Sequence, residues 1–545
     1  MRHVLAALLA VGVLGAACGG APPPPKPPPP KLHRLGDECS PGEQVAKTNC
    51  DTGLVCLPWA ESGVCTSACP CGAGATCADS LRLPELCYKT CTQDSDCRGG
   101  EGYLCDPSWK VCAPVLSLAV KSPTCESPAP APPRKAFGKV YQVSTSRSSP
   151  KGSFSPAALL DKENSLEIIY EAGVALGGNN NLAISKMDVD KGAVDGDREM
   201  RVDRQQALHP AVATDRNGRM VLVWHGFDGG FPGRRTMIGL STTTDGYNWG
   251  RPVIANDIST DCPNDRPDCV STPTIAIGPD LKDPKRDAMY VMYFSTVTKT
   301  LRMSRTYDGA SFSPSAGVGL GGYGDVLVTS SGMVHVVYGG GTGEGVNLLG
   351  DARNSIYYTR SEDGGTSFRQ PVKVSAEGEG IPFYFGRPKL VADYNRAILY
   401  AVYPAGSPDG RWEIILATSV DGGATWKRTT VNDDGPCASH MLPTATVDPQ
   451  GRIHVMWIEN RSGMGSVAYT VCQPNATKCS PNEIINDQPF AAYGFARHSS
   501  KSVGDGNALI YDAKRKMIHA VWTQPVDEGG NPVSRVFVSS AKVGK

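Results

Sequence analysis

Short apolar runs of two kinds alternate through residues 137–545, and their order predicts a repeated unit of β-strands. Runs of the first kind start at a proline or a polar substitute and reach an aspartate five residues later, at Pro156–Asp161, Pro210–Asp215, Pro388–Asp393, Pro443–Asp448 and Asn507–Asp512, with degenerate copies at Pro273–Gly278 and Asp325–Ser330. Runs of the second kind end in an aromatic residue, about 14 residues later in most copies: Tyr170, Trp224, Tyr293, Tyr338, Tyr403, Trp457 and Trp522. Short apolar runs bounded by turn residues are typical of strands.

A turn signature follows the partner of the second strand in four of these repeats. Ser419–Trp426 and Ser361–Phe368 carry Asp-Gly-Gly and end in an aromatic residue, and Thr243–Trp249 and Thr306–Phe312 are shorter copies with Asp-Gly. The aspartate can cap its own turn and the glycine accepts a positive φ, which predicts a hairpin. Each repeat then supplies four strands. The sequence predicts an all-β fold, a seven-bladed β-propeller of four-stranded antiparallel blades, or six blades if one degenerate repeat is an insertion.

The two ends of this region predict how the ring closes. The seventh repeat stops after its third strand, at Val536–Ser539, and no residues are left for a fourth. Lys139–Ser144, just before the first repeat, resembles the fourth strand at Pro371–Ser375. We expect it to complete the seventh blade, because an unpaired end would leave strand edges exposed.

The N-terminus predicts export and attachment to a membrane. Residues 1–17 read as a signal peptide, and the junction before Cys18 resembles a bacterial lipobox, which implies lipidation at Cys18. Residues 18–38 then form a proline-rich spacer, at about 3.1 Å per residue. The alternative is an ordinary secretory signal. The localisation expected is an exported, membrane-anchored lipoprotein of the cell envelope or cell surface.

Residues 39–121 predict a disulfide-stapled module, joined by a proline-rich linker at 122–136 to the propeller at 137–545. Of the 19 cysteines, 13 lie between Cys39 and Cys125, and exported thiols are usually oxidised. Zinc binding by close cysteine pairs is the alternative. Further pairs are expected within the propeller region, namely Cys262 with Cys269 and Cys472 with Cys479, and Cys125 could pair with Cys437.

The formal charge of the chain is balanced at +0, with 54 basic and 54 acidic residues. A balanced chain gives no argument for nucleic acid as a partner. No long apolar run follows residue 17, so no membrane-spanning helix is expected after the signal. We expect the lipid anchor to bind the membrane, and we expect a glycan or an extracellular protein as a further partner. The chain is expected to be a monomer and to need no cofactor.

The Asp-Gly turns on a propeller resemble the Asp-box (BNR) repeats of the sialidase superfamily, over roughly residues 137–545. The resemblance implies that the boxes lie opposite the active site, so Asp245, Asp308, Asp363 and Asp421 are expected to hold turns, with Trp426 and Phe368 packed on the neighbouring sheet. A family sialidase needs three arginines for the substrate carboxylate, an acid/base aspartate and a tyrosine–glutamate nucleophile.

Candidate ligand-binding residues then lie before the first strands of repeats and in the loops between second and third strands. The first choices are His209, Tyr384, Arg387, His440, Glu459 and Arg461, and further residues at such positions are Asp228, Arg234, Arg235, Glu344, Arg353, Arg411 and His498. For Glu459 and Arg461 the alternative is a solvated loop.

One family motif does not match, and it shapes the functional expectation. Family sialidases carry the first arginine in Phe/Tyr-Arg-Ile-Pro and have six blades, but Arg147 is the only arginine between Ala136 and Pro156. We therefore expect a surface-anchored propeller that binds carbohydrate or another extracellular ligand, without assured hydrolysis. The alternatives are an exo-sialidase-like glycoside hydrolase and a protein-interaction scaffold.

Two patterns could be mistaken for metal sites. His335, His454 and His519 each lie three residues before the aromatic of a second strand. Blades of a ring hold equivalent positions apart, so packing is expected there and no metal site. Asp188–Gly192 hints at a calcium loop but lacks the EF-hand spacing, so a hairpin turn is expected.

Overall fold

The computed structural model describes parts of residues 35–114 and most of residues 131–544. Within the second range the gaps are 135, 148, 150–151, 174–180, 201–205, 229–234, 258–268, 296, 341–354, 378, 380–386, 407–411, 435–437, 439, 460, 462–464, 477, 491–502, 505 and 530. The signal peptide, Cys18, the proline-rich spacer, Cys125 and Cys437 lie outside the described residues.

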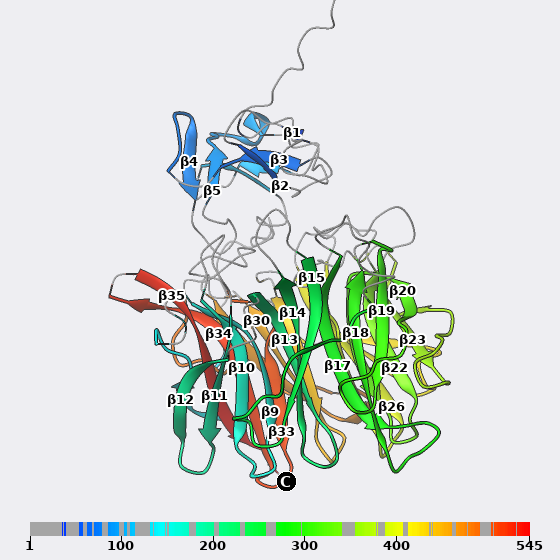
Figure 1. The fold of residues 1–545 in the computed structure, drawn as a ribbon. Helices are drawn as coiled ribbons and strands as arrows, with labels where there is room; N and C mark the ends of the chain where they lie inside the picture. Colours follow the sequence, from blue (N-terminus) through cyan, green and yellow to red (C-terminus); the bar gives the residue numbers. More distant parts are fainter. Residues whose placement is uncertain are drawn as a thin grey trace, which may run out of the picture.

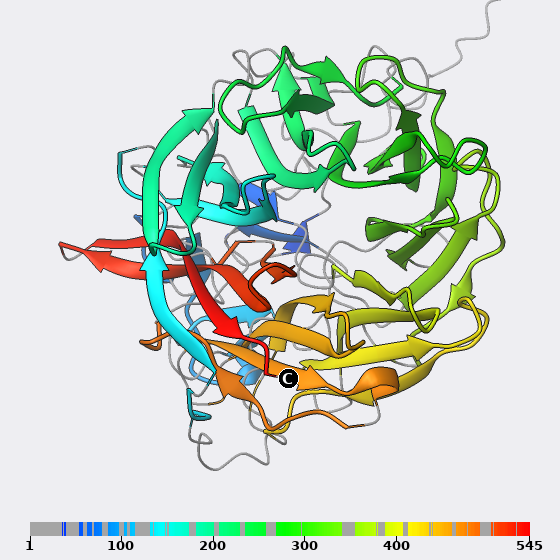
Figure 2. The same ribbon diagram turned by 90° about the horizontal axis from the view of Figure 1, so that it is seen from below.

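Residues 137–542 form seven four-stranded antiparallel sheets arranged around one axis (Figures 1 and 2). In order from the axis outward, the sheets are blade 1, β9 (Ser153–Leu160), β10 (Leu166–Ala172), β11 (Asn181–Asp188) and β12 (Ala193–Met200); blade 2, β13 (Gln206–Thr214), β14 (Met220–Asp228), β15 (Arg235–Thr243) and β16 (Val253–Ile254); blade 3, β17 (Val270–Pro279), β18 (Asp287–Ser295), β19 (Thr300–Thr306) and β20 (Ala316–Leu320); blade 4, β21 (Tyr323–Val328), β22 (Val334–Gly340), β23 (Ser355–Ser361) and β24 (Val372–Lys373); blade 5, β25 (Lys389–Asp393), β26 (Ile398–Gly406), β27 (Trp412–Ser419) and β28 (Lys427–Thr430); blade 6, β29 (His440–Val447), β30 (Ile453–Glu459), β31 (Ser466–Cys472) and β32 (Glu483–Ile484); and blade 7, β33 (Ala508–Asp512), β34 (Met517–Glu528), β35 (Asn531–Lys542) and β8 (Phe137–Gln142). The innermost strands contact one another in an unbroken circle from β9 round to β33 and back to β9. The predicted seven-bladed propeller is confirmed, and the six-bladed alternative is wrong.

The ring closes through the N-terminal strand, as predicted from the sequence. β8 pairs antiparallel with β35, and Val140 lies opposite Ser539. The strand starts two residues earlier than expected, at Phe137, and the expected strand at Val536–Ser539 is the middle of the longer β35. Beyond β8, the Val143 N–H still donates to the Val536 carbonyl at 2.9 Å. The first and last strands of the propeller therefore belong to one blade.

A polar residue ends the fourth strand of five blades in the same way. Its side-chain oxygen accepts a hydrogen bond from a backbone N–H of the third strand, at 2.7–3.0 Å, and the residues are Ser144, Asn256, Ser375, Asn432 and Asn486. This bond satisfies an N–H that two-residue strands such as β16, β24 and β32 are too short to reach. The match between Ser144 and Ser375 explains why residues 139–144 resembled a fourth strand.

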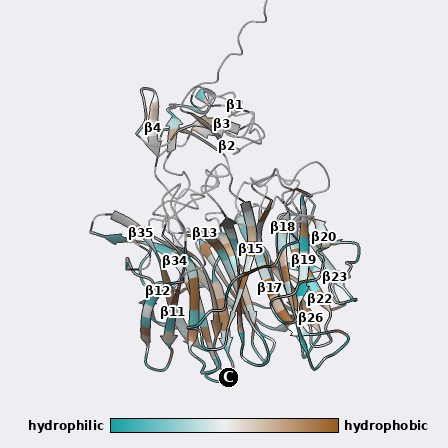
Figure 3. Ribbon diagram, viewed as in Figure 1, coloured by the Kyte–Doolittle hydropathy of each residue, from teal (hydrophilic) through white to brown (hydrophobic). Residues whose placement is uncertain are grey.

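The hydrophobic core is divided among the seams between blades. The described residues form seven buried clusters. Six of them join two consecutive blades, and the seventh joins blades 6 and 7 and also includes Trp412 of blade 5. On β14, Val221 and Val223 face blade 3 while Leu222 and Trp224 face blade 1. Alternate side chains of a strand point to opposite faces, so a strand covered on both sides is apolar throughout. Figure 3 shows this as brown strands with teal at the turns of the lower face.

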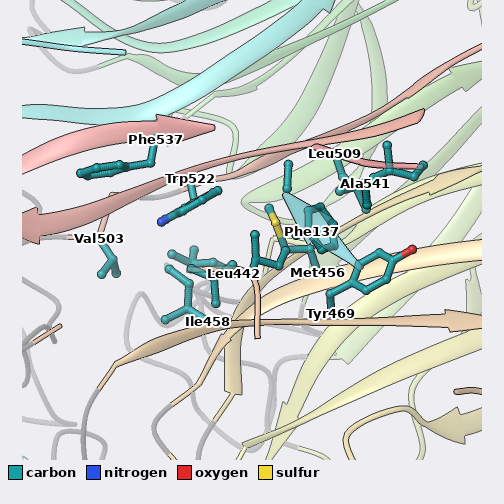
Figure 4. Packing of buried hydrophobic residues seen from close by; sticks show 14 of the residues in the cluster. Phe137, Leu442, Met456, Ile458, Tyr469, Val503, Leu509, Trp522, Phe537 and Ala541 are labelled. Carbon is teal, nitrogen blue, oxygen red and sulfur yellow. The ribbon is translucent and has the colours of Figure 1, made fainter. Parts of the chain in front are cut away.

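The seam between blades 6 and 7 contains the closing strand (Figure 4). Phe137 is 6% exposed and its ring meets Tyr469 of blade 6 edge-on, with centroids 4.9 Å apart. The residues just before it contact the same blade, because Pro133 accepts a hydrogen bond from the Ile484 N–H and the Ala136 N–H donates to Glu483. The end of the linker is thus attached to the edge of blade 6.

The cysteine-rich region contains three small sheets, ordered β1–β3–β2, β4–β5 and β6–β7. Their strands are β1 (Glu38–Cys39), β2 (Val55–Leu57), β3 (Gly63–Thr66), β4 (Ala75–Ala78), β5 (Leu86–Lys89), β6 (Tyr103–Cys105) and β7 (Cys112–Pro114). Disulfides join Cys71 to Cys87, Cys91 to Cys105, and Cys97 to Cys112. These six sulfurs are therefore not free to bind zinc, and the disulfide interpretation is confirmed for them.

A disulfide also joins Cys472 to Cys479 across the turn after β31, the pair expected from the sequence. Cys269 is disulfide-bonded as well, whereas Cys262 lies outside the described residues. Among the residues that the structure describes, no helix is long and apolar enough to cross a membrane.

Replacing Phe137 by alanine should destabilise the propeller, because it opens a cavity in the closing seam. Buried Phe→Ala changes cost about 3–5 kcal/mol. We expect a lower midpoint of denaturant unfolding for Phe137→Ala than for Lys139→Ala, on an exposed position of the same strand. Equal midpoints for the two variants would mean that β8 does not hold the ring together.

Candidate functional site

The antiparallel order of each blade separates two faces of the ring. First strands begin and second strands end on one face, which we call the loop face and which lies toward the top of Figure 1. First strands end and third strands end on the opposite face, the turn face, which carries the four Asp-Gly turns. Between second and third strands, residues 174–180, 229–234, 296, 341–354, 407–411, 460, 462–464 and 530 of the loop face lie outside the described residues, and between blades so do residues 201–205, 258–268, 378, 380–386, 435–437, 439, 491–502 and 505.

The four Asp-Gly turns are held by their own aspartates and by the preceding blade. Asp421 accepts hydrogen bonds from the Thr425 N–H at 3.0 Å and from the Ser419 hydroxyl at 2.8 Å. The hydroxyl of Thr425 donates to the same carboxylate, and together these bonds hold the pKa of Asp421 at about 2. The same pattern recurs at Asp245, Asp308 and Asp363.

Arginines of the preceding blade bind the glycine carbonyls of three of these turns. Arg198 donates to Gly246, Arg305 to Gly364 and Arg360 to Gly422, at 2.7–2.8 Å. The Trp426 ring lies 5.3 Å from the ring of Tyr358 in the preceding blade. The polar groups of the turn face are thus used to join blades, in agreement with the structural role expected for the Asp-Gly turns.

One position of the second strand lies in the seam with the following blade. It lies three residues before the aromatic, faces the following blade and is buried in every blade: Glu167, Val221, Tyr290, His335, Tyr400, His454 and His519. His335 bonds the hydroxyl of Tyr358, which donates to Gly422 in blade 5. His454 bonds Tyr469, and His519 bonds Ser540. The three histidines lie in separate seams, as expected for packing.

Asp188 caps the hairpin between β11 and β12, as predicted for residues 188–192. Its carboxylate accepts hydrogen bonds from the N–H groups of Asp190 and Lys191, both at 3.1 Å. Asp190 pairs with Arg515 of blade 7 at 2.6 Å. The acidic residues of this loop thus have protein partners.

A cavity of about 230 Å³ lies on the axis, where the innermost strands of all seven blades meet. Its wall is mostly backbone and small apolar side chains, with the charged residues Asp325, Arg387 and Lys389 and the imidazole of His209. Two candidate residues, His209 and Arg387, therefore share one cavity although they come from blades 2 and 5.

The backbone at the loop-face ends of the innermost strands is strained. The residue before proline has a positive φ at Ser155, His209, Thr272 and Leu442, between 48° and 52°. Each lies where the pairing with the second strand shifts register. Proline has no N–H to give to the sheet, and the preceding residue normally takes an extended conformation. Non-glycine residues in this region cost of order 1–3 kcal/mol each.

His209 shows what supports one of these strained residues. Its backbone N–H donates to the Glu171 carboxylate of blade 1 at 2.7 Å. Its ring stacks on that of His225, with centroids 6.1 Å apart and planes at 11°. All three residues are buried, with exposed fractions between 1% and 7%. His209 is thus a buried part of the seam between blades 1 and 2 as well as of the cavity wall.

The other candidates, His440, Glu459 and Arg461, meet in a buried ionic cluster at the loop-face end of blade 6. His440 begins β29 and Glu459 ends β30 directly opposite it. Arg461 binds both oxygens of Glu459, at 2.6 and 2.7 Å, and donates to Asn482 at 3.0 Å. Glu459 is 1% exposed and Arg461 6%. The solvated-loop alternative for these two residues is wrong.

The segment between blades 5 and 6 completes this cluster. His440 Nε2 lies 2.9 Å from Asp434 Oδ2, and His440 Nδ1 lies 2.7 Å from the Trp412 carbonyl oxygen. Asp433 accepts a hydrogen bond from Arg461 at 3.0 Å. Sequence analysis missed Asp433, Asp434 and Asn482. The sequence signal for the two aspartates is the run Asn432-Asp433-Asp434 that follows the fourth strand of blade 5.

The electrostatics of the cluster favour the ionised form of Asp434 and the protonated form of His440. Burial opposes ionisation of Asp434, but the hydrogen bond from His440 and the charges of His440 and Arg461 outweigh it and hold its pKa at about 2. Burial lowers the pKa of His440, but the hydrogen bond and the charge of Asp434 raise it by more, so the pKa of His440 is raised overall. Burial raises the pKa of Glu459 in spite of Arg461.

Metal binding is the obvious alternative for this cluster, since ligand atoms of Asp434, His440 and Glu459 all lie within 4.8 Å of one another. The guanidinium of Arg461, however, lies against both oxygens of Glu459 and 3.7 Å from Asp434. A cation in the cluster would be close to this positive charge. The donor set therefore fits an ion-pair network better than a metal centre.

Several sequence candidates cannot be placed. Tyr384, His498, Arg234, Glu344, Arg353 and Arg411, and the side chains of Asp228 and Arg235, lie outside the described residues. The two arginine candidates that can be placed are not in one pocket, because Arg387 lines the axial cavity and Arg461 lies in the blade 6 cluster. The structure thus divides the candidates between two places.

Comparison with known proteins gives structural matches only. No protein-family model and no curated sequence matches the chain. A protein of unknown function from Dyadobacter fermentans is 12% identical with a TM-score of 0.45, covering 74% of this chain and 99% of its own. A Hadza microbial sialidase is 14% identical with a TM-score of 0.42, covering 62% and 69%. A polysaccharide lyase is 8% identical with a TM-score of 0.45, covering 75% and 100%. At these identities and scores the matches carry no argument about activity.

Replacing Arg461 alone should destabilise blade 6, because it leaves Glu459 buried without its partner. Removing one member of a buried pair costs about 3–5 kcal/mol. We expect Arg461→Gln to lower the free energy of unfolding by this amount, and Glu459→Gln/Arg461→Gln to recover part of the loss. Denaturant unfolding measures both. A double variant that is less stable than Arg461→Gln would contradict this account.

The stability of the propeller should fall with rising pH because of Glu167. Burial raises the pKa of Glu167 to about 7 although Lys186 lies 3.3 Å away. The folded state holds this proton more tightly than the unfolded state, whose pKa is near 4.5. The contribution of protonated Glu167 to the free energy of unfolding is therefore complete below pH 4.5 and is lost as the pH rises through 7. A difference of this size is worth about 3 kcal/mol.

Thermal unfolding of Glu167→Gln against the original chain tests this. We expect the variant to gain stability relative to the original chain between pH 5 and pH 8. Glu163→Gln is the control, since the Glu163 side chain is 65% exposed beside the same lysine. Parallel pH profiles for the original chain and Glu167→Gln would show that Glu167 titrates as an ordinary carboxyl group.

Proposed function

We propose that this chain is an exported, lipid-anchored lipoprotein of the cell envelope or surface, whose propeller binds a carbohydrate or another extracellular ligand through its loop face. The strained residues Ser155, His209, Thr272 and Leu442 carry the proposal, because all four lie at the loop-face ends of the innermost strands. Strain of this kind persists where function needs it. The turn face has fewer polar groups available for a ligand, since its Asp-Gly turns are bound to neighbouring blades.

Binding without hydrolysis is the form of the proposal that the described residues support best. A sialidase-like reaction needs several arginines around one carboxylate, and Arg387 and Arg461 lie in separate places. Arg461 also donates four hydrogen bonds to Glu459, Asp433 and Asn482. The resemblance of the Asp-Gly turns to Asp boxes supports a carbohydrate as the first ligand class to test.

The full chain should bind members of a glycan array and release no product from a fluorogenic sialoside. A matched pair of variants separates the faces. Thr272→Gly relaxes a strained residue of the loop face and should change glycan affinity, whereas Asp421→Asn alters the turn face and should leave it unchanged. Turnover of the sialoside would favour the exo-sialidase-like alternative. No binding to the glycan array and no turnover of the sialoside would favour a protein-interaction scaffold.

The anchor is tested by replacing Cys18 with serine. A thioether-linked lipid on Cys18 would keep the chain in the membrane fraction of the cells that export it. We expect Cys18→Ser to move the protein to the soluble fraction and to abolish labelling by a radioactive fatty acid. Lys139→Ser, at an exposed position of β8 that leaves the N-terminus intact, is the control for non-specific loss. Membrane retention of Cys18→Ser would contradict the anchor.

A further inference from the structure

The wall of the axial cavity has few side chains that can bind a charge. Five innermost strands carry a proline at the same level, namely Pro156, Pro210, Pro273, Pro388 and Pro443, and the remaining two carry Gly324 and Asn507 there. Proline has no N–H and glycine has no side chain. Recognition of a small molecule here therefore depends on the few polar groups that project from this ring.

Arg387 has more donors than partners. A guanidinium carries five N–H donors, and within the described part of the chain that of Arg387 makes one hydrogen bond, to the Pro273 carbonyl of blade 3 at 3.2 Å. On the way it passes the ring of Tyr323 in blade 4, at 6.0 Å from the centroid. Other arginines of the propeller are paired with carboxylates: Arg216, Arg286, Arg396, Arg452, Arg461, Arg515 and Arg535. No carboxylate among the described residues pairs with Arg387 in this way.

The other charged groups beside Arg387 compensate one another. Lys389 Nζ lies 3.0 Å from Asp325 Oδ2, and Asp325 also accepts a hydrogen bond from the Leu390 N–H at 2.9 Å. The Lys389 side chain is 40% exposed, so solvent reaches this part of the wall. Because Lys389 and Asp325 neutralise each other, the positive charge of Arg387 is not compensated, and it favours an anion as the ligand.

Asn507 in blade 7 adds an unsatisfied acceptor to the same wall. Its Nδ2 donates to the Leu442 carbonyl at 3.0 Å, while its buried Oδ1 has no hydrogen-bond partner. A buried acceptor without a partner costs about 1–3 kcal/mol. A ligand that fits both groups carries negatively charged oxygens for Arg387 and a hydroxyl for Asn507.

We propose that the axial cavity binds a small free oxyanion that retains a proton, with inorganic phosphate as the probe. Its charged oxygens accept from Arg387 and its P–OH group donates to Asn507. A volume of about 230 Å³ holds such an ion with several waters, at about 30 Å³ per water. Blades 5 and 7, which supply Arg387 and Asn507, lie on either side of blade 6, so the bound ion would join two blades that are not neighbours. This site does not depend on the proposed glycan binding at the loop face.

Calorimetry and thermal unfolding of the full chain with phosphate, sulfate and chloride at equal ionic strength test the proposal. Phosphate should bind saturably and raise the unfolding temperature, sulfate should bind more weakly because it has no proton to donate at neutral pH, and chloride should have no saturable effect. Arg387→Gln should weaken phosphate binding at least tenfold. Arg251→Gln, at an exposed position, is the matched control and should bind as the original chain does.

Two further variants keep the test decisive if Arg387→Gln does not fold. Arg387→Lys keeps the charge with fewer donors and should weaken binding by less than Arg387→Gln. Asn507→Ala should remove the preference for phosphate over sulfate and retain binding of both. The proposal is overturned if phosphate gives no saturable effect in the original chain, if its affinity is unchanged in both Arg387 variants, or if Arg251→Gln loses it equally.

Discussion

Burial of each blade between its two neighbours is the constraint on which the rest of this structure depends. A second strand such as β14 sends Val221 and Val223 to one seam and Leu222 and Trp224 to the other. Neither seam exists until a neighbouring blade is present. No blade can therefore be stable alone, and some polar groups within the seams are held by the next blade, as the Tyr358 hydroxyl is by the Gly422 carbonyl of blade 5.

The same constraint explains how much of the fold could be predicted from the sequence. Proline and aspartate mark both ends of most innermost strands, and the aromatic of the second strand fills the preceding seam, so strand order and blade number follow from spacing. The lengths of the strands were less predictable from the sequence. The twelve-residue β34 and β35 and the two-residue fourth strands depend on what each edge packs against, and Ser144 or Asn432 ends a strand through a bond that only the assembled blade provides.

The candidate site was predicted only in part, for a physical reason. Sequence position placed His209, Arg387, His440, Glu459 and Arg461 at the loop-face ends of strands, and the structure has them there. Whether a polar side chain at such an end faces solvent or a partner depends on residues from other blades. Arg461 is buried because Asp433 and Asn482 come from neighbouring segments, whereas Arg387 meets only the carbonyl of Pro273. Pattern alone cannot separate these two arginines.

The pairing of β8 with β35 has a consequence for the order in which the chain folds. Ser539 bonds the carbonyl of Lys139, 400 residues away in the sequence. The entropy of closing so long a loop grows only slowly with its length, but contacts at this separation form late. During synthesis the first strand of the propeller is made long before its partner exists. Its apolar side stays unpaired until β35 has been made, so the ring closes only when these two strands of blade 7 meet.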